Sequence, residues 1–207
     1  MFWIYCFVIA VIAYFGGSFN GAIVASKYIF HKDVREYGSG NAGLTNFHRV
    51  FGFKGLLLVI LIDVAKTALC VWLGGELFKM CGYGVALGKI YAGFWVVMGH
   101  FYPIMYGFQG GKGVLACGVL SFMIDWRVGA VVWGVFLLTV IITRMVSLGS
   151  VLGAVTLATS VAAFGFGIKA FLLALICSGF VIARHSENIK RIVRREESKL
   201  SFKKKKK

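Results

Sequence analysis

The sequence predicts an all-α integral membrane protein with about seven transmembrane helices, and five to seven as the range. Hydrophobic residues make up 59% of the 207-residue chain, above the roughly 45–50% that is usual in soluble domains. The mean hydropathy is +0.82, and the apolar residues occur in long runs between short polar segments. No stretch shows the alternation of a half-buried strand. The bilayer is therefore the expected solvent.

Seven apolar segments are candidates for spans, which need about 20 residues, or about 17 at the least. In chain order they are 2–30, 55–73, 83–106, 114–124, 128–143, 148–166 and 170–183. The first is longer than a span requires and carries Gly16, Gly17, Ser18 and Asn20 within it. The fourth and seventh are short and can be partial or re-entrant. Small residues spaced four apart, such as Gly17 with Gly21 and Gly149 with Gly153, predict close helix packing.

The first segment is expected to remain in the protein as a membrane helix. It has no basic region before it, and the apolar run continues past Phe15 without an Ala-x-Ala cleavage pattern.

The basic residues predict the orientation. Seven spans put most of them on one side of the membrane, namely Lys27, Lys32, Arg35, Arg49, Lys54, Lys112, Arg144 and those from Arg184 onward. The other side receives Lys79, Lys89, Arg127 and Lys169. The positive-inside rule then places the N-terminus outside and the C-terminus in the cytoplasm. We expect a polytopic membrane domain over 1–183 and a basic cytoplasmic tail over 184–207, ending in the run 203–207 that attracts anionic headgroups.

The net charge of +15 would suggest nucleic acid as the partner of a soluble protein. Here the charges flank apolar segments, so membrane lipid is the predicted partner and nucleic acid is not. The five cysteines have no C-x-x-C spacing, and the four histidines have no metal-ligand spacing. Neither a metal site nor a cofactor is predicted.

A glycine-rich polar segment lies between the first two spans, at residues 35–49. It supplies neutral hydrogen-bonding groups, glycines that let a ligand approach the backbone, and two arginines suited to phosphate. The residues are Arg35, Gly38, Ser39, Gly40, Asn41, Gly43, Thr45, Asn46 and Arg49. The alternative is a solvated loop in which the arginines act only as topology signals.

A second such segment, residues 107–113, ends in Gly110, Gly111, Lys112 and Gly113 just before an apolar run. Free backbone N–H groups at a helix start, joined by a lysine, suit an anion such as phosphate. It is not a Walker A loop, because Tyr106 stands at the first glycine position and Gly113 at the Ser/Thr position. The alternative is a flexible turn with a snorkelling lysine.

Two weaker segments fall on the same predicted side. Ser147 and Ser150 follow Arg144, and either serine can simply cap a helix. His185 lies beside Glu187 and Asn188 at a membrane exit, where it can position or deprotonate a hydroxyl, or serve no special role.

Asp63 and Lys66 lie three residues apart within the second span and can pair on one helix face. Intramembrane charges are functional candidates and would support a small transporter for an anionic solute. A structural ion pair is slightly favoured.

Together these segments resemble the bacterial acyl-phosphate:glycerol-3-phosphate acyltransferases of the PlsY type, over nearly the whole chain. The matching residues are Gly38, Ser39, Gly40, Asn41, Thr45, Asn46 and Arg49; Gly99, His100, Tyr102, Pro103, Gly107 and 110–113; Arg144, Ser147 and Leu148; and Arg184, His185, Glu187 and Asn188. The departures are Leu44, Gln109 and Ser186, and the absence of a proline near Gly17.

The resemblance implies a multi-pass enzyme of the bacterial inner membrane that transfers a fatty acyl group from acyl phosphate to the 1-hydroxyl of glycerol 3-phosphate. It implies that Ser39, Arg49, Lys112, His185 and Asn188 hold glycerol 3-phosphate. The backbone of 38–43 and Ser147 would hold the acyl phosphate, and Thr45, Asn46, Gly110, Gly111 and Gly113 would complete the substrate site. The acyl chain would lie in an apolar groove between spans.

Overall fold

The computed structural model describes residues 2–200, and the regular secondary structure within them is helical. The long helices are α1 (Phe2–Ser18), α2 (Gly21–Phe30), α4 (Leu56–Met80), α5 (Val85–Phe101), α6 (Val114–Ile124), α7 (Trp126–Thr143), α8 (Val146–Ala163) and α9 (Ile168–Arg184). The short helices are η1 (Val34–Glu36), α3 (Leu44–Phe51), η2 (Ile104–Tyr106) and α10 (Ser186–Val193). The lysine run 203–207 lies outside the described residues.

Each of the seven predicted segments consists mainly of helix, which confirms the all-α prediction. Among the described residues, Phe2–Phe30, Leu56–Met80, Trp126–Thr143 and Val146–Ala163 are long and apolar enough to cross a membrane. The pair α9 and α10, bent by 60°, would make a fifth span if counted as one. α5 and α6 are shorter because glycine-rich polar segments begin or end them. That seven segments cross the bilayer stays a prediction.

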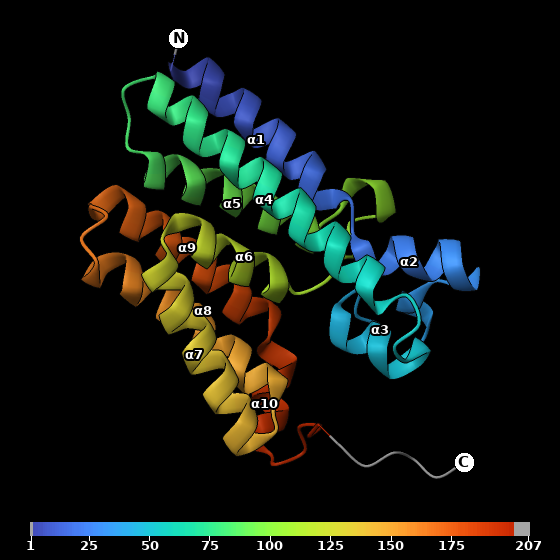
Figure 1. Cartoon of the computed structure of the whole chain (residues 1–207). Helices are drawn as coiled ribbons and strands as arrows, with labels where there is room; N and C mark the ends of the chain where they lie inside the picture. Colours follow the sequence, from blue (N-terminus) through green and yellow to red (C-terminus); the bar gives the residue numbers. More distant parts are fainter. Residues whose placement is uncertain (1, 201–207) are drawn as a thin grey trace, which may run out of the picture.

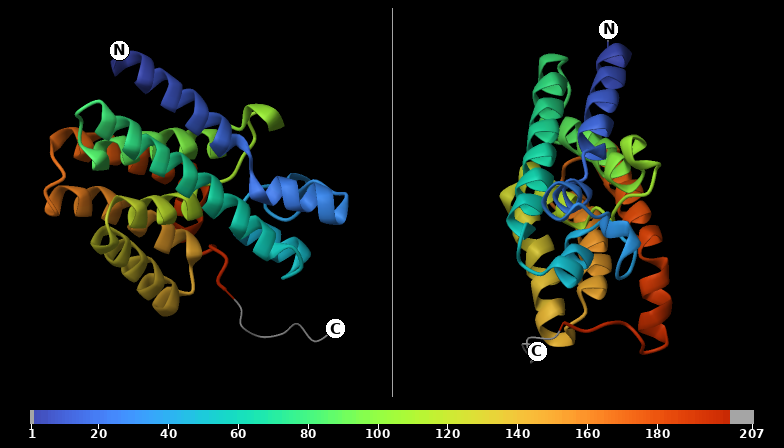
Figure 2. Two further views of the ribbon diagram at one scale, coloured as in Figure 1. Left: turned by 45° about the horizontal axis from the view of Figure 1, so that its top comes forward. Right: turned by 90° about the vertical axis from the view of Figure 1, so that its right-hand side faces the viewer.

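The helices form two groups. α1, α4 and α5 pack side by side, and α6, α7, α8 and α9 pack into a second group against them (Figure 1). The start of α1 lies at the opposite end of the molecule from α10 (Figure 2). α3 also lies away from the end where α1 begins (Figure 1).

The first predicted segment is broken in two by Asn20. Its side chain caps α2 by accepting a hydrogen bond from the N–H of Ile23 at 3.1 Å, and it donates to the carbonyl of Ala42 at 3.0 Å. This residue is fully buried. A buried polar side chain is stable only when its groups are paired, so the break in the helix also fixes the glycine-rich segment that follows.

Glycines bring the helices close together, as predicted. A Cβ at Gly17 would collide with the backbone of Val96 in α5, and one at Gly21 would meet Val59 in α4. A Cβ at Gly149 would lie 3.0 Å from the carbonyl oxygen of Phe136 in α7. These small residues let the helix backbones approach closely, so that van der Waals packing holds the helices together. Such packing is needed because burial away from lipid gives apolar side chains no hydrophobic gain.

Candidate functional site

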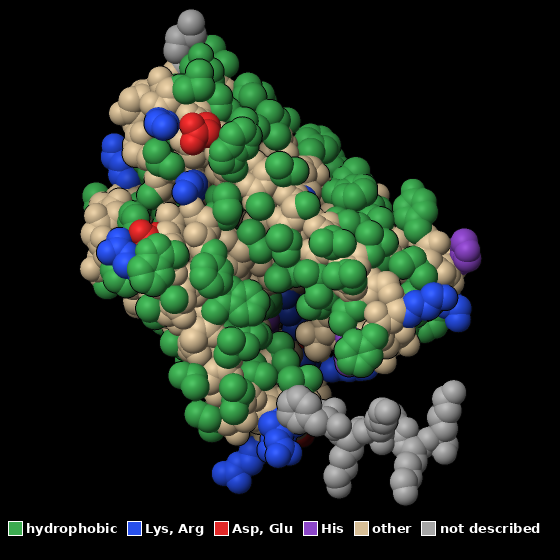
Figure 3. Space-filling model, viewed as in Figure 1, with side chains coloured by type: hydrophobic (Ala, Val, Ile, Leu, Met, Phe, Trp, Pro, Cys, Tyr) green, Lys and Arg blue, Asp and Glu red, His purple; other side chains and the backbone are tan. Residues whose placement is uncertain are grey.

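The predicted polar segments meet at one cavity of about 320 Å³. On the face seen in Figure 3, Lys and Arg side chains are visible inside a hollow. The polar residues that line the cavity are Ser39, Asn41, Thr45, Asn46, Arg49, Asp63, His100, Lys112, Ser147, Ser150, His185, Asn188, Arg191, Glu197, Ser198 and Lys199. They come from parts of the chain as far apart as the segment before α3 and the residues after α10.

Four helices present their N-termini to this cavity. Its wall includes Thr45 in the first turn of α3, Val114 at the start of α6, Ser147 in the first turn of α8, and Asn188 in the first turn of α10. The residues before these four helices form no side-chain cap hydrogen bond. A helix N-terminus carries unpaired N–H groups and a partial positive charge, so the four together favour an anion.

Full positive charges reinforce these helix ends. Arg49, Lys112 and Arg191 line the cavity, and the Lys112 ammonium donates a hydrogen bond to the Asn188 side-chain oxygen. Burial, together with the nearby charge of Arg191, lowers the pKa of Lys112 to about 8. The ammonium is thus partly dehydrated, and the arginines near it outnumber its one acidic neighbour, Glu197, so it is suited to receive an anionic ligand.

His185 is buried at the turn between α9 and α10, and it lines the cavity. Its Nδ1 lies 2.8 Å from the carbonyl oxygen of Val181. A carbonyl oxygen only accepts, so Nδ1 carries the proton of the neutral ring and Nε2 is left as the basic nitrogen. The turn therefore fixes the tautomer that a general base needs.

The segment before α3 owes its shape to Gly38 and Asn46. Gly38 has φ +62°, and a Cβ there would collide with the Asn46 amide oxygen. That oxygen accepts from the N–H of Ser39 at 2.9 Å, while the amide nitrogen donates to Val34 and Tyr37. Asn46 is therefore bonded mainly to its own segment, although it also lines the cavity.

The segment before α6 is folded differently from the prediction of free glycine N–H groups. The N–H of Gly110 donates to Phe101 at 3.1 Å, and that of Gly111 donates to His100 at 3.0 Å. The Arg184 guanidinium lies 3.3 Å from the Gly111 carbonyl oxygen. These two amides are therefore used within the protein, and they hold Lys112 in place.

Most of the predicted site residues line the cavity, namely Ser39, Asn41, Gly43, Thr45, Asn46, Arg49, Lys112, Gly113, Ser147, His185 and Asn188. The predicted residues that do not line it are Gly38, Gly40, Gly110 and Gly111. Arg35 is also elsewhere: its guanidinium pairs with Asp33 at 2.7 Å and donates to the carbonyl of Gln109 at 3.2 Å. It ties two loops together.

The charges within the helices form a closed network beside the cavity. Lys66 Nζ lies 2.7 Å from Asp63 Oδ1 and 3.1 Å from His100 Nδ1, and it donates to the carbonyl of Gly17 at 3.1 Å. Asp63 also accepts from the N–H of Gly21 at 3.1 Å. The predicted pairing of Asp63 with Lys66 is confirmed. His100 was not predicted to join it, because no sequence spacing links α4 with α5.

Sequence reasoning also missed the C-terminal residues of the site. Arg191 and residues 197–200 line the cavity. They belong to a segment that was predicted only as a basic tail, and its return to the site depends on the bend after α9. The local sequence carries no signal for that return.

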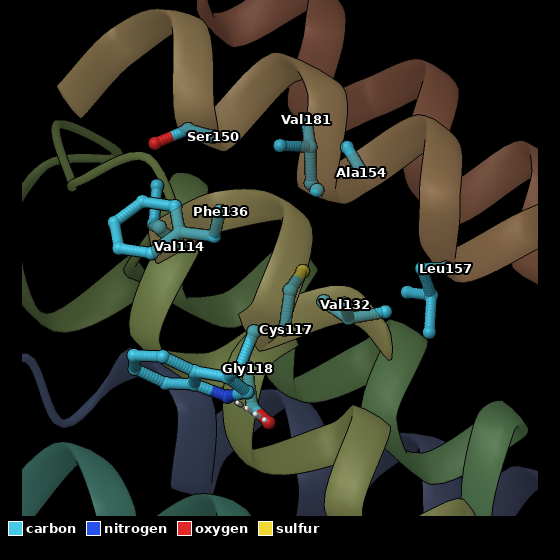
Figure 4. A pocket seen from close by; sticks show the side chains of 11 residues that line it. Val114, Cys117, Gly118, Val132, Phe136, Ser150, Ala154, Leu157 and Val181 are labelled. Atoms are coloured by element: carbon cyan, nitrogen blue, oxygen red, sulfur yellow. Dashed lines mark hydrogen bonds between the residues drawn. The ribbon is translucent and has the colours of Figure 1, made fainter. Parts of the chain in front are cut away.

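A second, apolar pocket of about 40 Å³ adjoins the first. It shares Val114, Trp133, Phe136 and Ser150 with the polar cavity. Cys117, Val132, Leu157 and Val181 surround the rest of it (Figure 4). The indole N–H of Trp133 donates to the carbonyl of Gly118 at 3.1 Å, which joins α6 to α7 at the pocket wall.

Comparisons with known proteins agree on one family. The sequence profile described as "Glycerol-3-phosphate acyltransferase" matches residues 7–195. A protein of that name from Finegoldia magna is 38% identical, over 97% of this chain and 98% of its own length. One from Thermoanaerobacter sp. is 36% identical, over 96% and 98%.

Solved structures agree as well. A crystal structure of PlsY, described as an integral membrane glycerol 3-phosphate acyltransferase in its glycerol 3-phosphate form, superposes with a TM-score of 0.85. It is 28% identical, and the match covers 95% of this chain and 96% of that one. Its lysophosphatidic acid form gives a TM-score of 0.82 at 27% identity, over 95% of each chain. The chain therefore belongs to the glycerol-3-phosphate acyltransferase family of bacterial multi-pass membrane proteins.

Proposed function

We propose that this protein, a membrane glycerol-3-phosphate acyltransferase, takes its acyl group from acyl phosphate and delivers it to the 1-hydroxyl of glycerol 3-phosphate. The products are lysophosphatidic acid and inorganic phosphate. The observation that carries this proposal is the convergence of four helix N-termini with Arg49, Lys112 and Arg191 on one cavity. Both substrates carry phosphate, so a site of this charge suits two anionic groups at once.

The two substrates bind to different residues of the cavity. Glycerol 3-phosphate is held by Ser39, Arg49, Lys112, His185 and Asn188. Ser147 and the N-termini of α6 and α8 receive the acyl phosphate, whose acyl chain begins in the apolar pocket beside Trp133 and Phe136. The family resemblance implied that backbone N–H groups of residues 38–43 hold the acyl phosphate. The N–H groups of Ser39, Gly40 and Gly43 already donate to Asn46, Tyr37 and Asn41, so we assign that role to Ser147 and the two helix N-termini instead.

In the reaction, the 1-hydroxyl oxygen bonds to the acyl carbonyl carbon, and the bond from that carbon to the phosphate oxygen breaks. The hydroxyl proton passes to His185 Nε2 or to a phosphate oxygen of the substrate. Phosphate is a stable leaving group, so positioning and charge stabilisation supply most of the acceleration. In the described part of the chain, the hydroxyls of Ser147 and Ser150 donate to Glu197 and to the carbonyl of Val146, and not to a histidine that could activate them. We therefore propose direct transfer to the substrate hydroxyl without an acyl-enzyme.

The protein is placed in the bacterial inner membrane with its N-terminus outside and its C-terminus in the cytoplasm. Two observations support this orientation. The cavity is lined by polar segments that the positive-inside rule assigns to the cytoplasmic side, and α3 and α10 lie away from the end where α1 begins. Glycerol 3-phosphate then enters from the cytoplasm, and the acyl donor enters from the lipid.

The test is an assay of the purified full-length protein in detergent. We expect lysophosphatidic acid and inorganic phosphate to form in equal amounts from glycerol 3-phosphate and acyl phosphate. Transfer from acyl-CoA at a comparable rate would overturn the donor assignment. The transporter alternative predicts flux of glycerol 3-phosphate into sealed vesicles without acyl transfer; its motivating charges, Asp63 and Lys66, are neutralised by each other at 2.7 Å.

A further inference from the structure

The chain returns to the cavity after α10. The residues that follow this helix cross toward the start of α8, where the N–H of Leu200 donates to the carbonyl of Arg144 at 2.8 Å. Residues 197–200 line the cavity as a result. We call residues 196–200 the strap.

Glu197 places its carboxylate among the donors of the anion site. Its Oε1 accepts from Ser147 Oγ at 2.8 Å and from Asn188 Nδ2 at 2.7 Å. Its Oε2 accepts from Arg191 Nε at 2.8 Å, and the side chain is only 5% exposed. A hydroxyl, an amide and a guanidinium thus converge on one carboxylate, at the N-termini of α8 and α10. The same set of donors fits the oxygens of a phosphate.

The strap also engages a second cationic group. Arg49 donates to Ser198 Oγ at 3.2 Å, from α3 on the other side of the cavity. Burial raises the pKa of Glu197, but hydrogen bonds from Asn188 and Ser147 lower it, and the resulting pKa is below its ordinary value. Glu197 is therefore an anion at neutral pH. Ser147 and Asn188 donate to Glu197, and Arg49 donates to Ser198. The proposed function assigns all three of these residues to substrate binding.

We propose that the strap is autoinhibitory, with the Glu197 carboxylate filling a substrate-phosphate subsite until phosphate displaces it. This rests on the proposed function. A carboxylate carries one negative charge and a phosphate close to two, so phosphate is the better ligand for the same donors. While Glu197 is bound, only the open fraction of molecules can bind substrate, and the apparent affinity falls by that fraction.

The first test compares two substitutions of neighbouring glutamates. We expect Glu197→Ala to lower the KM for glycerol 3-phosphate or for acyl phosphate by about tenfold, because it empties the subsite. Glu196→Ala is the matched control: it removes the same charge one residue away, from an exposed side chain that does not line the cavity. Its KM values should stay within about twofold of the wild type.

Equal KM values for Glu197→Ala and the wild type would overturn the proposal, and so would a lower kcat/KM, which would make Glu197 a helper of the reaction. An inactive wild type would instead refute the proposed function. The two failures are therefore distinct.

The second test follows the strap itself. Trypsin cleaves after Arg195 and Lys199, which flank Glu197. We expect saturating glycerol 3-phosphate or acyl phosphate to speed this cleavage in the full-length protein, because the strap leaves the cavity. Slower cleavage with substrate would show a lid that closes over it, and an unchanged rate with both would show no displacement; either result would overturn the proposal.

Discussion

Replacing Lys112 by methionine removes the ammonium from the cavity and keeps most of the apolar stem. Two unit charges about 4 Å apart interact by about 4 kcal/mol at an effective dielectric constant of about 20. Arg49, Arg184 and Arg191 lie near Lys112 and share the attraction for phosphate, and dehydration of the ammonium offsets another part. We therefore expect a loss of about 2–3 kcal/mol in transition-state binding, which is roughly 30- to 150-fold in kcat/KM.

The assay is the initial rate of lysophosphatidic acid formation at low concentrations of both substrates. Lys190→Met is the matched control, because this lysine is exposed and pairs with Glu187 at 2.8 Å outside the cavity. It should keep kcat/KM within about twofold of the wild type. Both variants should elute from size exclusion as the wild type does. A folded Lys112→Met protein within about threefold of wild-type kcat/KM would refute the phosphate-site reasoning.

Three further predictions concern pH, the proton acceptor and the buried charges. The KM for glycerol 3-phosphate should rise above about pH 8, because the pKa of Lys112 is lowered from 10.5 to about 8 and its positive charge is lost there. In a pH series, Lys112→Arg should abolish this rise, because an arginine stays charged over the whole range. His185→Gln should lower kcat by about 10²-fold and also raise the KM for glycerol 3-phosphate, which His185 helps to hold, and an unchanged kcat would assign the proton to a substrate phosphate. Asp63→Asn should lower the free energy of unfolding in detergent by about 3–5 kcal/mol, because Lys66 is left buried without its anion. Glu76→Gln, which breaks an exposed pair with Lys79 at 4.0 Å, should change it by less than about 1 kcal/mol, and equal effects would refute the burial argument.

The helices were predictable because each depends on a long local run of apolar residues. The break at Asn20 was foreshadowed by the polar residues inside the first segment, but its position depends on the bond to Ala42, which no local pattern encodes. α5 ends at Phe101, shortly before Pro103, and α6 begins directly after Gly113, whose φ is positive.

The site was predictable to the extent that polar segments had to gather on one side of a membrane. Lys112, Ser147, His185 and Asn188 reached one cavity as that reasoning required. The hydrogen-bond partner of each group could not be predicted in the same way. The Gly110 and Gly111 N–H groups, for example, donate to backbone carbonyls and not to a ligand. Glu197 was missed for a related reason: its contacts arise from a tertiary return of the chain.

The spacing of Asp63 and Lys66 has a consequence for biogenesis. Because the two charges lie one turn apart on α4, this helix can neutralise itself before any neighbour is present. His100 and the carbonyl of Gly17 join them only when the other helices assemble. A helix left with one uncompensated charge at its centre would face a cost of about 2.5–3.5 kcal/mol at the translocon. The pair therefore favours insertion of α4 as an independent unit, whatever the order in which its neighbours arrive.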